Sequence, residues 1–368
     1  MGTQEKTGME ILIKKNSHRT IRIGFVPLND AAPFLLAREL DLFGDYGLDV
    51  QLSRELGWAS IRDKVATGEL TAAQSILGLP LAMFSSNAPS SLQPFIAPLI
   101  TSLQGNGITI AQHFRDEGCQ TPHSMMHWHR DKGTSRPLTF AIVSRYSSHH
   151  ILIRQWLKSD GIDPDTDVNM VVLPPPQMVH HIKAGHIDGY CVGEPWNSIS
   201  IMAGSGFCVA TSAEISPYHP EKVFMVSRQF VESDEEQCIK LVAAVLEACK
   251  LCNQPSSLDM MSRVLARHDY LNLSPDVLRD TLTGNIIRQN NSKLDATREF
   301  IVFSGERVNA PCSRKRNWIG KHMTETGLMN IPETCKASLL KSIYDEKLYQ
   351  SATELTDASA IPHQPSAA

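Results

Sequence analysis

The stretch from residue 171 to 196, "VVLPPPQMVHHIKAGHIDGYCVGEPW", holds the densest group of side chains that could do chemistry. It contains three successive prolines followed by three histidines, a lysine and a glutamate. Imidazole and carboxylate groups transfer protons near neutral pH. The stretch is therefore either an active site, in which Glu194 or a histidine transfers protons, or a scaffold that shapes a pocket for a ligand.

Three other motifs could contribute to an anion-binding pocket. The serines of "SSHH" open a predicted helix, so Ser147 or Ser148 can cap it while His149 and nearby backbone N–H groups face an anion. The alternative is a plain cap with His149 on the surface. Lys222, in "HPEKV", is predicted in a loop, where a lysine is usually only solvated. Trp58, in "LGWAS", is either a core aromatic or a pocket wall.

The elements that must position these residues alternate along the chain. Apolar runs of strand length are followed by segments with helical spacing, which is typical of α/β folds with parallel strands. The predicted strands are 20–28, 48–56, a run starting at 71, 138–143, 168–173 and 188–193, and the predicted helices are 32–47, 60–70, 147–161 and 175–186. Ligands of such folds collect at the carboxyl ends of strands, where Pro174, Gly193 and the "SSHH" turn are expected.

Length and composition limit the possible functions. The 368 residues exceed what one core usually supports, so two lobes are expected. A net charge of -4 gives no polybasic signature for nucleic acid. No apolar run of signal-peptide or membrane-span length occurs, so we expect a cytoplasmic protein with no membrane partner. The eight scattered cysteines favour reduced thiols over disulfides.

Two groups of possible metal ligands are interpreted as structural. The pair Cys249 and Cys252 forms a CxxC inside a predicted helix without a second pair. His127 and His129 lie in the polar stretch 116–137, interpreted as a loop, with no close carboxylate or cysteine in the motif. We therefore expect neither a metal nor another cofactor.

Several motifs together resemble the nitrate and bicarbonate solute-binding proteins of ABC transporters and their cytoplasmic relatives, the nitrate/nitrite sensors of the NasS type. The motifs are "GFVPLNDAAPFLLARELDLFGDYGLDV", "GWASIRDKVATGEL", "GIDPDTDVNMVVLPPPQMVHHIKAGHIDGYCVGEPWN" and "HPEKVF". The resemblance implies an α/β, type II periplasmic-binding-protein-like fold, with a ligand cleft between two α/β lobes. The expected division is an extension at 1–19, lobe one at 20–110 and 205–345, lobe two at 111–204, and a disordered tail at 346–368.

By the same resemblance, six positions would contact a small oxyanion. They are Trp58, Asn106, His149, Pro175, Val192 and Lys222. Asn106 departs from the glutamine expected in a nitrate-transport protein, which shortens the reach of the amide. "TAAQ" and "SSHH" also depart from the family's Asp-Ala-Ala-His and Gly-Thr-His-Asp patterns. Bicarbonate-binding members use an acidic group with a metal where Lys222 stands, so the lysine favours nitrate or nitrite.

The expected function is that of a non-enzymatic cytoplasmic sensor. Nitrate or nitrite would close the lobes and release a NasT-like response regulator with an RNA-binding antiterminator domain, as the resemblance to the sensors implies. One alternative is the substrate-binding protein of an ABC-type nitrate/nitrite transporter. A more distant alternative is an enzyme like the thiamine-pyrimidine synthases, but the scattered cysteines do not match the cluster of that class.

Overall fold

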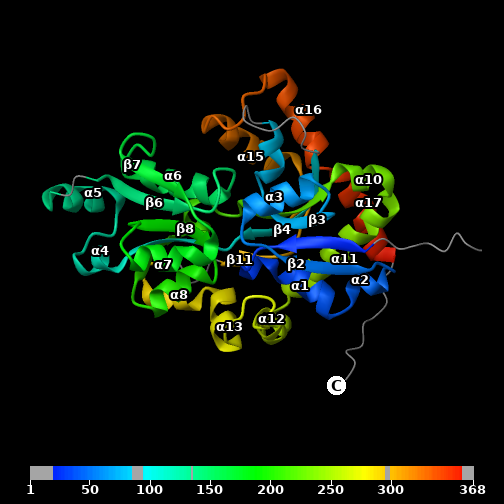
Figure 1. Ribbon diagram of the computed structural model, residues 1–368, viewed down its shortest axis with the longest axis horizontal. Coiled ribbons are helices and arrows are strands. Elements are labelled where there is room, and N and C mark those ends of the chain that lie inside the picture. Colours follow the sequence, from blue (N-terminus) through cyan, green and yellow to red (C-terminus); the bar gives the residue numbers. More distant parts are fainter. Residues whose placement is uncertain (1–19, 85–93, 134–135, 295–298, 359–368) are drawn as a thin grey trace, which may run out of the picture.

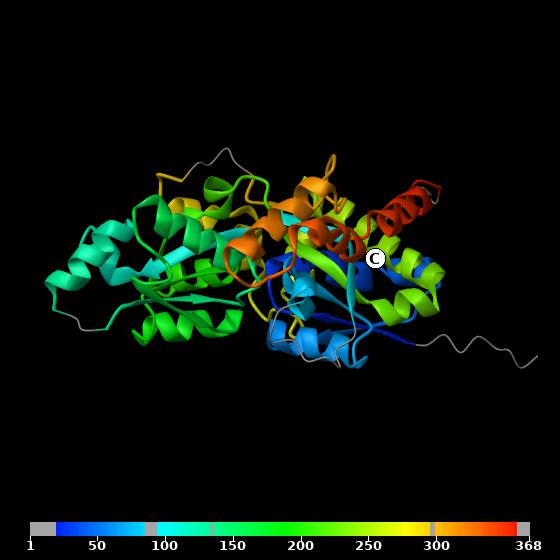
Figure 2. The ribbon, with the colours of Figure 1, turned by 90° about the horizontal axis from the view of Figure 1, so that it is seen from above.

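The computed structural model describes residues 20–84, 94–133, 136–294 and 299–358. These residues form two lobes side by side, each built around its own β-sheet, as Figure 1 and the view from above in Figure 2 show. The predicted α/β fold of the periplasmic-binding-protein type, with two sheet-containing lobes, is confirmed.

The sheet of lobe one has six strands in the order β11-β4-β10-β3-β1-β2. Strands β1, β2 and β3 pair in parallel, whereas β10, β4 and β11 are joined by antiparallel pairing, so the sheet is mixed. Their bounds are β1 Ile21–Phe25, β2 Val50–Arg54, β3 Ala72–Ile76, β4 Phe95–Gln104, β10 Pro220–Ser227 and β11 Ile301–Val302. Every residue of β3, β4 and β10 is buried, as expected for strands covered on both faces.

The sheet of lobe two has five strands in the order β7-β6-β8-β5-β9. Their bounds are β5 Asn106–Ala111, β6 Leu138–Ile142, β7 Val168–Val172, β8 Gly189–Gly193 and β9 Gly206–Thr211. Strand β6 pairs in parallel with β7 and β8, while β5 is antiparallel to β8 and β9. The carboxyl ends of β6, β7 and β8 therefore point the same way, and the loops that follow them can share one site.

Helices cover both sheets. The α-helices are α1 Ala32–Glu39, α2 Leu42–Asp45, α3 Trp58–Ala66, α4 Gln112–Asp116, α5 Pro122–Asp131, α6 Ser148–Ser159, α7 Met178–Lys183, α8 Trp196–Met202, α9 Ser212–Ile215, α10 Arg228–Ser233, α11 Glu235–Cys252, α12 Leu258–Leu265, α13 Pro275–Thr283, α14 Asn285–Asn290, α15 Ser313–Glu325, α16 Glu333–Ile343 and α17 Glu346–Ala358. Short 3-10 turns are η1 Asn29–Ala31, η2 Leu79–Phe84, η3 Pro175–Gln177 and η4 Pro255–Ser257. Within the described ranges, no helix is both long and apolar enough to cross a bilayer.

The expected lobe boundaries differ from the sheets by one strand at each crossing. The expected division places all of β9 and all but the last residue of β5 in lobe one, but both strands belong to the sheet of lobe two. The chain crosses between the lobes at Gly105 and again between Thr211 and Pro220. Gly105 has φ +88°, a left-handed conformation that glycine adopts without a steric penalty, and this permits the sharp passage from β4 to β5.

Two segments expected to be irregular are helical. Part of the predicted tail, residues 346–358, forms α17, which packs on α11 through the buried Leu348 and Ala352. The histidine-rich stretch forms α5, because Thr121 and Ser124 make a reciprocal cap and Pro122 occupies the first turn. The expected extension at 1–19 and the rest of the tail lie outside the described residues.

Candidate anion-binding site at the lobe interface

The site is built around two successive residues of β10, Glu221 and Lys222. Successive residues of a regular strand face opposite sides of the sheet, but the pairing of β10 with β4 shifts register at Lys222. Both side chains therefore turn toward the same buried region, and Nζ of Lys222 lies 2.6 Å from Oε1 of Glu221. Neither residue is exposed to solvent.

The Glu221 carboxylate gathers donors from lobe two. Nδ2 of Asn106 donates to Oε2 over 2.7 Å, Ser148 donates its hydroxyl to the same oxygen, and Nε2 of His149 lies 3.2 Å from Oε1. His219, in the turn before β10, places Nε2 3.1 Å from Oε2. A single carboxylate of lobe one thus joins both lobes.

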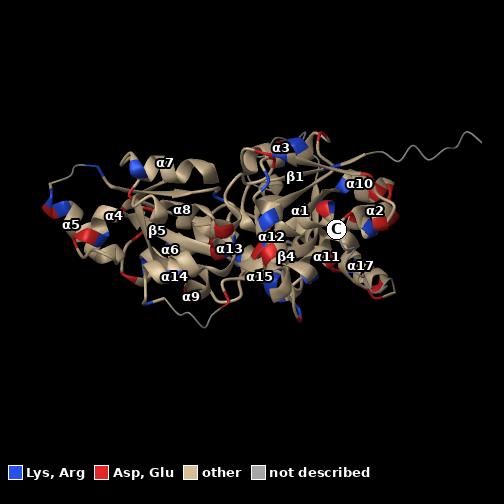
Figure 3. Ribbon diagram, turned by 90° about the horizontal axis from the view of Figure 1, so that it is seen from below, with Lys and Arg blue, Asp and Glu red and all other residues tan. Residues whose placement is uncertain are grey.

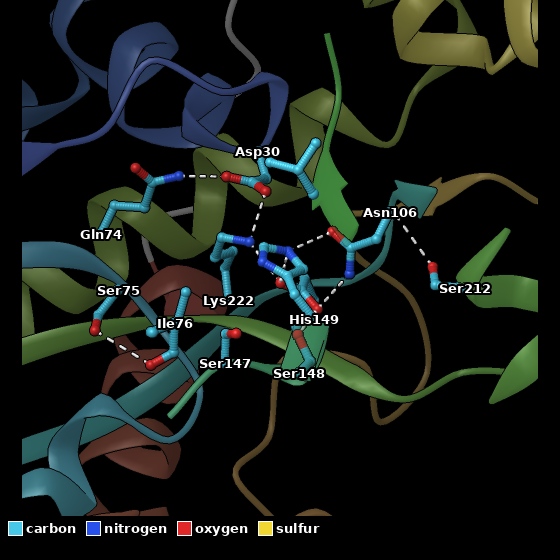
Figure 4. Close-up of polar contacts among 12 residues, drawn as sticks. Asp30, Gln74, Ser75, Ile76, Asn106, Ser147, Ser148, His149, Ser212 and Lys222 are labelled. Atoms are coloured by element: carbon cyan, nitrogen blue, oxygen red, sulfur yellow. Dashed lines mark hydrogen bonds and ion pairs between the residues drawn. The ribbon is translucent and has the colours of Figure 1, made fainter. Parts of the chain in front are cut away.

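Lys222 has a second carboxylate partner in lobe one. Its Nζ lies 2.9 Å from Oδ2 of Asp30, which belongs to η1 after β1. Gln74 of β3 donates to the other Asp30 oxygen, and its own Oε1 accepts from the backbone N–H of Val26 over 2.9 Å, which fixes the amide orientation. Figure 4 shows Asp30 and Lys222 facing each other, with His149 and Asn106 beside them.

These contacts set the charges of Lys222 and Glu221. Burial disfavours both ions, but Asp30 and Glu221 outweigh it at Lys222 and raise the pKa of the ammonium group. At Glu221 the charge of Lys222 and the hydrogen bonds from the histidines likewise outweigh burial and hold the pKa well below its usual range. The two residues therefore form a buried ion pair at neutral pH.

At Asp30 and His149, burial outweighs the neighbouring charges and sets the direction of the pKa shift. Burial raises the pKa of Asp30, although Lys222 and Gln74 counteract part of the effect. Burial lowers the pKa of His149, although the neighbouring Glu221 counteracts part of the effect. His149 is therefore neutral at neutral pH in this arrangement.

Two buried nitrogen atoms in the site have no hydrogen-bond partner among the described residues. They are Nε1 of Trp58 in lobe one and Nδ1 of His149 in lobe two. Trp58 is the first residue of α3, and His149 is the second residue of α6, so both lie at helix N-termini that favour negative charge. Nζ of Lys222 lies 5.6 Å from the centre of the Trp58 ring. Buried polar groups normally have partners, so these two nitrogens mark a position for a ligand.

The other two predicted contacts supply apolar surface. Val192 of β8 is fully buried, and it shares one hydrophobic cluster with Trp58. Pro175 is buried at the start of η3. Its neighbour Pro174 lies close to Gly57 of lobe one, since a Cβ atom added to Gly57 would be 4.0 Å from Cβ of Pro174. Apolar walls exclude water and strengthen the polar contacts of a bound anion.

A surface pocket opens beside this region, between the lobes. It has a volume of about 400 Å³ and is lined by Ala59 and Arg62 of lobe one and by Arg145 and Tyr146 of lobe two. Ala59 follows Trp58 in the chain, and Tyr146 lies three residues before His149. The two arginines give an anion a positive approach to the site.

The structure thus brings Trp58, Asn106, His149 and Lys222 to one region. Lys222 lies in a strand rather than in the predicted loop. Asn106 has its oxygen and one donor engaged by His149 and Glu221, so it orients other groups in this arrangement.

Sequence reasoning missed Glu221, Asp30, Gln74 and His219. Glu221 stands next to Lys222 in "HPEKV", and Asp30 follows the first predicted strand. These positions, beside Lys222 and after a strand, were the only indication in the sequence that the two carboxylates belong to the site. In a regular strand, Glu221 would face the opposite side of the sheet from Lys222.

The stretch at 171–196 is a scaffold rather than a catalytic centre. His180 and His186 are exposed, and the ring of His186 contacts His181. Glu194 is buried and accepts a hydrogen bond from the backbone N–H of Ser198 over 3.3 Å. Burial raises the pKa of Glu194 to about 7. Its backbone carbonyl accepts from Asn29 over 2.8 Å, which ties lobe two to lobe one.

Within the described ranges, no three histidine, cysteine, aspartate or glutamate residues are placed to hold a metal ion. His127 pairs with Asp131 on the surface of α5, whereas Nε2 of His129 lies 2.5 Å from the carbonyl oxygen of Arg136. His127 and His129, interpreted from the sequence as structural rather than metal-binding, therefore have separate partners.

The two-lobed fold, with a buried site between the lobes, is that of the periplasmic-binding-protein class. The chain belongs to the NMT1-like family, which it matches over residues 14–266.

Named relatives are transport and binding proteins for nitrate and bicarbonate. The bicarbonate transport ATP-binding protein CmpC of Synechococcus elongatus is 34% identical over 85% of this chain and 46% of its own length. The nitrate/nitrite binding protein NrtA of the same species is 27% identical over 91% of this chain and 77% of its own. The chain spans about half the length of the first of these relatives.

The fold is shared with the periplasmic nitrate-binding protein NrtA of Synechocystis PCC 6803. Its crystal structure superposes with a TM-score of 0.83, at 22% identity, over 94% of this chain and 92% of that one. The predicted resemblance to the nitrate and bicarbonate solute-binding proteins is confirmed, and the two NrtA relatives, matched over most of their own length, are named as binding proteins. The narrower assignment to NasS-type sensors stays a prediction.

Proposed function

We propose that this protein binds nitrate or nitrite between its lobes, against Trp58, His149 and Lys222. The observation that carries the proposal is a pair of buried nitrogens from opposite lobes, Nε1 of Trp58 and Nδ1 of His149, neither of which has a hydrogen-bond partner in the part of the chain that the structure describes. A small planar oxyanion has acceptor oxygens on all sides, so it can accept from both nitrogens and thereby hold the lobes together.

The surroundings of Lys222 favour nitrate or nitrite over bicarbonate held by a metal. The relatives are named for both kinds of anion, so the choice rests on the site. The ammonium group lies 2.9 Å from Asp30 and 2.6 Å from Glu221, and it compensates carboxylates that would otherwise need a cation. An anion can therefore bind without a metal.

The transport role fits the relatives better than the sensor role does. Nitrate/nitrite binding protein NrtA matches most of this chain, and other relatives are named as nitrate import or bicarbonate transport proteins. We infer that the chain serves as the substrate-binding component of an ABC-type nitrate/nitrite system. This was the alternative in the sequence analysis.

The sensor role, with a NasT-like partner and a cytoplasmic location, remains a second proposal. It is supported by the resemblance of the motifs alone. Co-purification with such a regulator, lost on addition of nitrate, is its expected result. A partner that stays bound at saturating nitrate would contradict it.

The binding proposal is tested by thermal unfolding with nitrate, nitrite, bicarbonate and chloride at equal ionic strength. At about 100 times the dissociation constant, a bound ligand adds roughly 2.7 kcal/mol to the free energy of unfolding. Nitrate or nitrite should raise the midpoint more than bicarbonate and chloride do. Equal midpoints in all four salts would contradict the proposal.

A further inference from the structure

The ring of His149 is held in one tautomer by two acceptors. Its Nε2 lies 2.8 Å from Oδ1 of Asn106 and 3.2 Å from Oε1 of Glu221. The Asn106 amide cannot be reversed, because its Nδ2 donates to the ionised Glu221 over 2.7 Å. Nε2 of His149 therefore carries the proton, and Nδ1 of the neutral ring is a bare lone pair with no partner among the described residues.

The carboxylates around His149 outnumber the ammonium groups before any anion arrives. Positive charge comes from Lys222. His219 also faces Glu221: its Nδ1 lies 2.9 Å from the carbonyl oxygen of Ser216 and its Nε2 lies 3.1 Å from Glu221. Negative charge comes from Glu221 and, beyond Lys222, from Asp30.

These four groups come from β10, the turn before it and η1, the elements packed around His149. A monoanion added to one ammonium group and two carboxylates increases the excess of negative charge in a buried site. Such a charge is costly, and a neutral His149 cannot offset it. It also presents a lone pair, which repels an oxygen that has no hydrogen.

We propose that Glu221 is the positioning residue that holds His149 with its proton on Nε2, and that nitrate or nitrite binds together with one proton taken from solvent onto Nδ1. This inference rests on the proposed function. The imidazolium donates from Nδ1 to an anion oxygen, while Nε2 keeps its contacts with Asn106 and Glu221. No covalent bond forms, and the proton returns to solvent when the anion leaves.

The protonation state of the unliganded site agrees with this sequence of events. Burial lowers the pKa of His149, so the ring is neutral at neutral pH until an anion reaches it. An anion at Nδ1 favours the charged ring and raises that pKa.

The test is a calorimetric titration of the whole chain with nitrate, in two buffers of different ionisation enthalpy, from about pH 6.5 to about pH 8.5. Above the pKa of His149, the nitrate Kd should rise about ten-fold per pH unit, because only the protonated fraction binds. Uptake should approach one proton per nitrate. A Kd independent of pH, with the same heat in both buffers, would overturn the inference.

Matched variants assign the proton to one atom. His149→Gln keeps a donor near the position of Nε2 but has no titrating Nδ1, so its nitrate Kd should not depend on pH. The neighbouring His150 donates from Nδ1 to the carbonyl of Arg145 over 3.0 Å, and His150→Asn keeps that donor. His150→Asn should therefore keep the proton uptake, as should Glu194→Gln. Uptake that persists in His149→Gln, or is lost in Glu194→Gln, would contradict the assignment.

Glu221→Gln separates a positioning role from a merely structural one. The substitution removes the negative charge that favours a protonated His149 and leaves an acceptor in its place, so nitrate should bind with reduced proton uptake. Weaker binding with unchanged uptake would show that Glu221 only supports the fold. If the unaltered protein bound no nitrate, the proposed function would fail as well, whereas binding without proton uptake would remove this inference alone.

Discussion

The ammonium group of Lys222 lies 2.6 Å from the carboxylate of Glu221, its immediate neighbour in β10. The two side chains meet because the pairing of β10 with β4 is irregular at this point. The same carboxylate receives hydrogen bonds from Asn106 and Ser148 of the other lobe. One strand irregularity in lobe one thus places both the charge of the site and its link to lobe two.

Removing the ammonium group should destabilise the fold. In Lys222→Met, Asp30 and Glu221 remain buried without their cation, and breaking such a pair costs about 3–5 kcal/mol in the free energy of unfolding. Chemical denaturation measures the change. The surface variant Lys132→Met, at a half-exposed position, should change it by less than about 0.5 kcal/mol.

Neutralising one of the two carboxylates provides the control for this explanation. Asp30→Asn in the Lys222→Met background should recover part of the lost stability, because one buried negative charge disappears. If the single variant were as stable as the unaltered protein, or the second substitution made no difference, the buried ion network would not be the reason.

Removing the indole N–H of Trp58 should weaken nitrate binding with little additional cost to the unliganded protein. Trp58→Phe breaks no hydrogen bond in the described structure, because Nε1 has no partner there. A lost hydrogen bond to the anion should weaken affinity roughly ten-fold, or about 1.4 kcal/mol. Calorimetry gives the affinity and denaturation gives the stability.

Trp128 provides a matched control in lobe two. Its Nε1 is also buried without a partner among the described residues, but it lies on α5, at the far end of the lobe (Figure 1). Trp128→Phe should leave nitrate affinity unchanged. Equal affinities in both variants would remove Trp58 from the site.

Glu194 should make stability depend on pH. Its pKa is raised from 4.5 to about 7 by burial, so between those values the folded protein holds a proton that the unfolded chain has lost. Stability contributed by the protonated carboxyl is therefore present below about pH 4.5, falls as the pH rises toward about 7, and is lost above it. The free energy of unfolding should fall by about 3 kcal/mol over this pH range because of Glu194.

Glu194→Gln should remove this pH dependence. The free energy of unfolding of the variant, relative to the unaltered protein, should rise between about pH 5 and about pH 8 by roughly the same amount. Denaturation at the two pH values measures it. If the variant and the unaltered protein differed in free energy of unfolding by the same amount at both pH values, the Glu194 carboxyl would not titrate between them.

The α/β order of lobe two could be predicted because local patterns there are strong. The apolar runs that form β6, β7 and β8 alternate along the chain with the amphipathic segments that form α6 and α7. The stretch that became α5 is rich in polar residues, so its helical cap at Thr121 and Ser124 was overlooked. Strand β10 was missed because it begins with a proline and two charged residues, which are rare in buried strands.

The site was predictable only where a motif marks it. Trp58, His149 and Lys222 follow from recognisable motifs, and the structure brings them together. The partners Glu221 and Asp30 depend on a register shift and on the approach of η1 to β10, which arise from tertiary packing. No local pattern reports such contacts. In Figure 3, acidic and basic residues lie on both lobes, so overall charge does not indicate the site either.

The central claim is that the buried nitrogens of Trp58 and His149, beside Lys222, receive nitrate or nitrite. The most direct measurement is a calorimetric titration of the whole chain with nitrate, with chloride at equal ionic strength as the blank. The account predicts a saturable heat with one nitrate per chain, weakened in Trp58→Phe and unchanged in Trp128→Phe. No saturable heat with either nitrate or nitrite would contradict it.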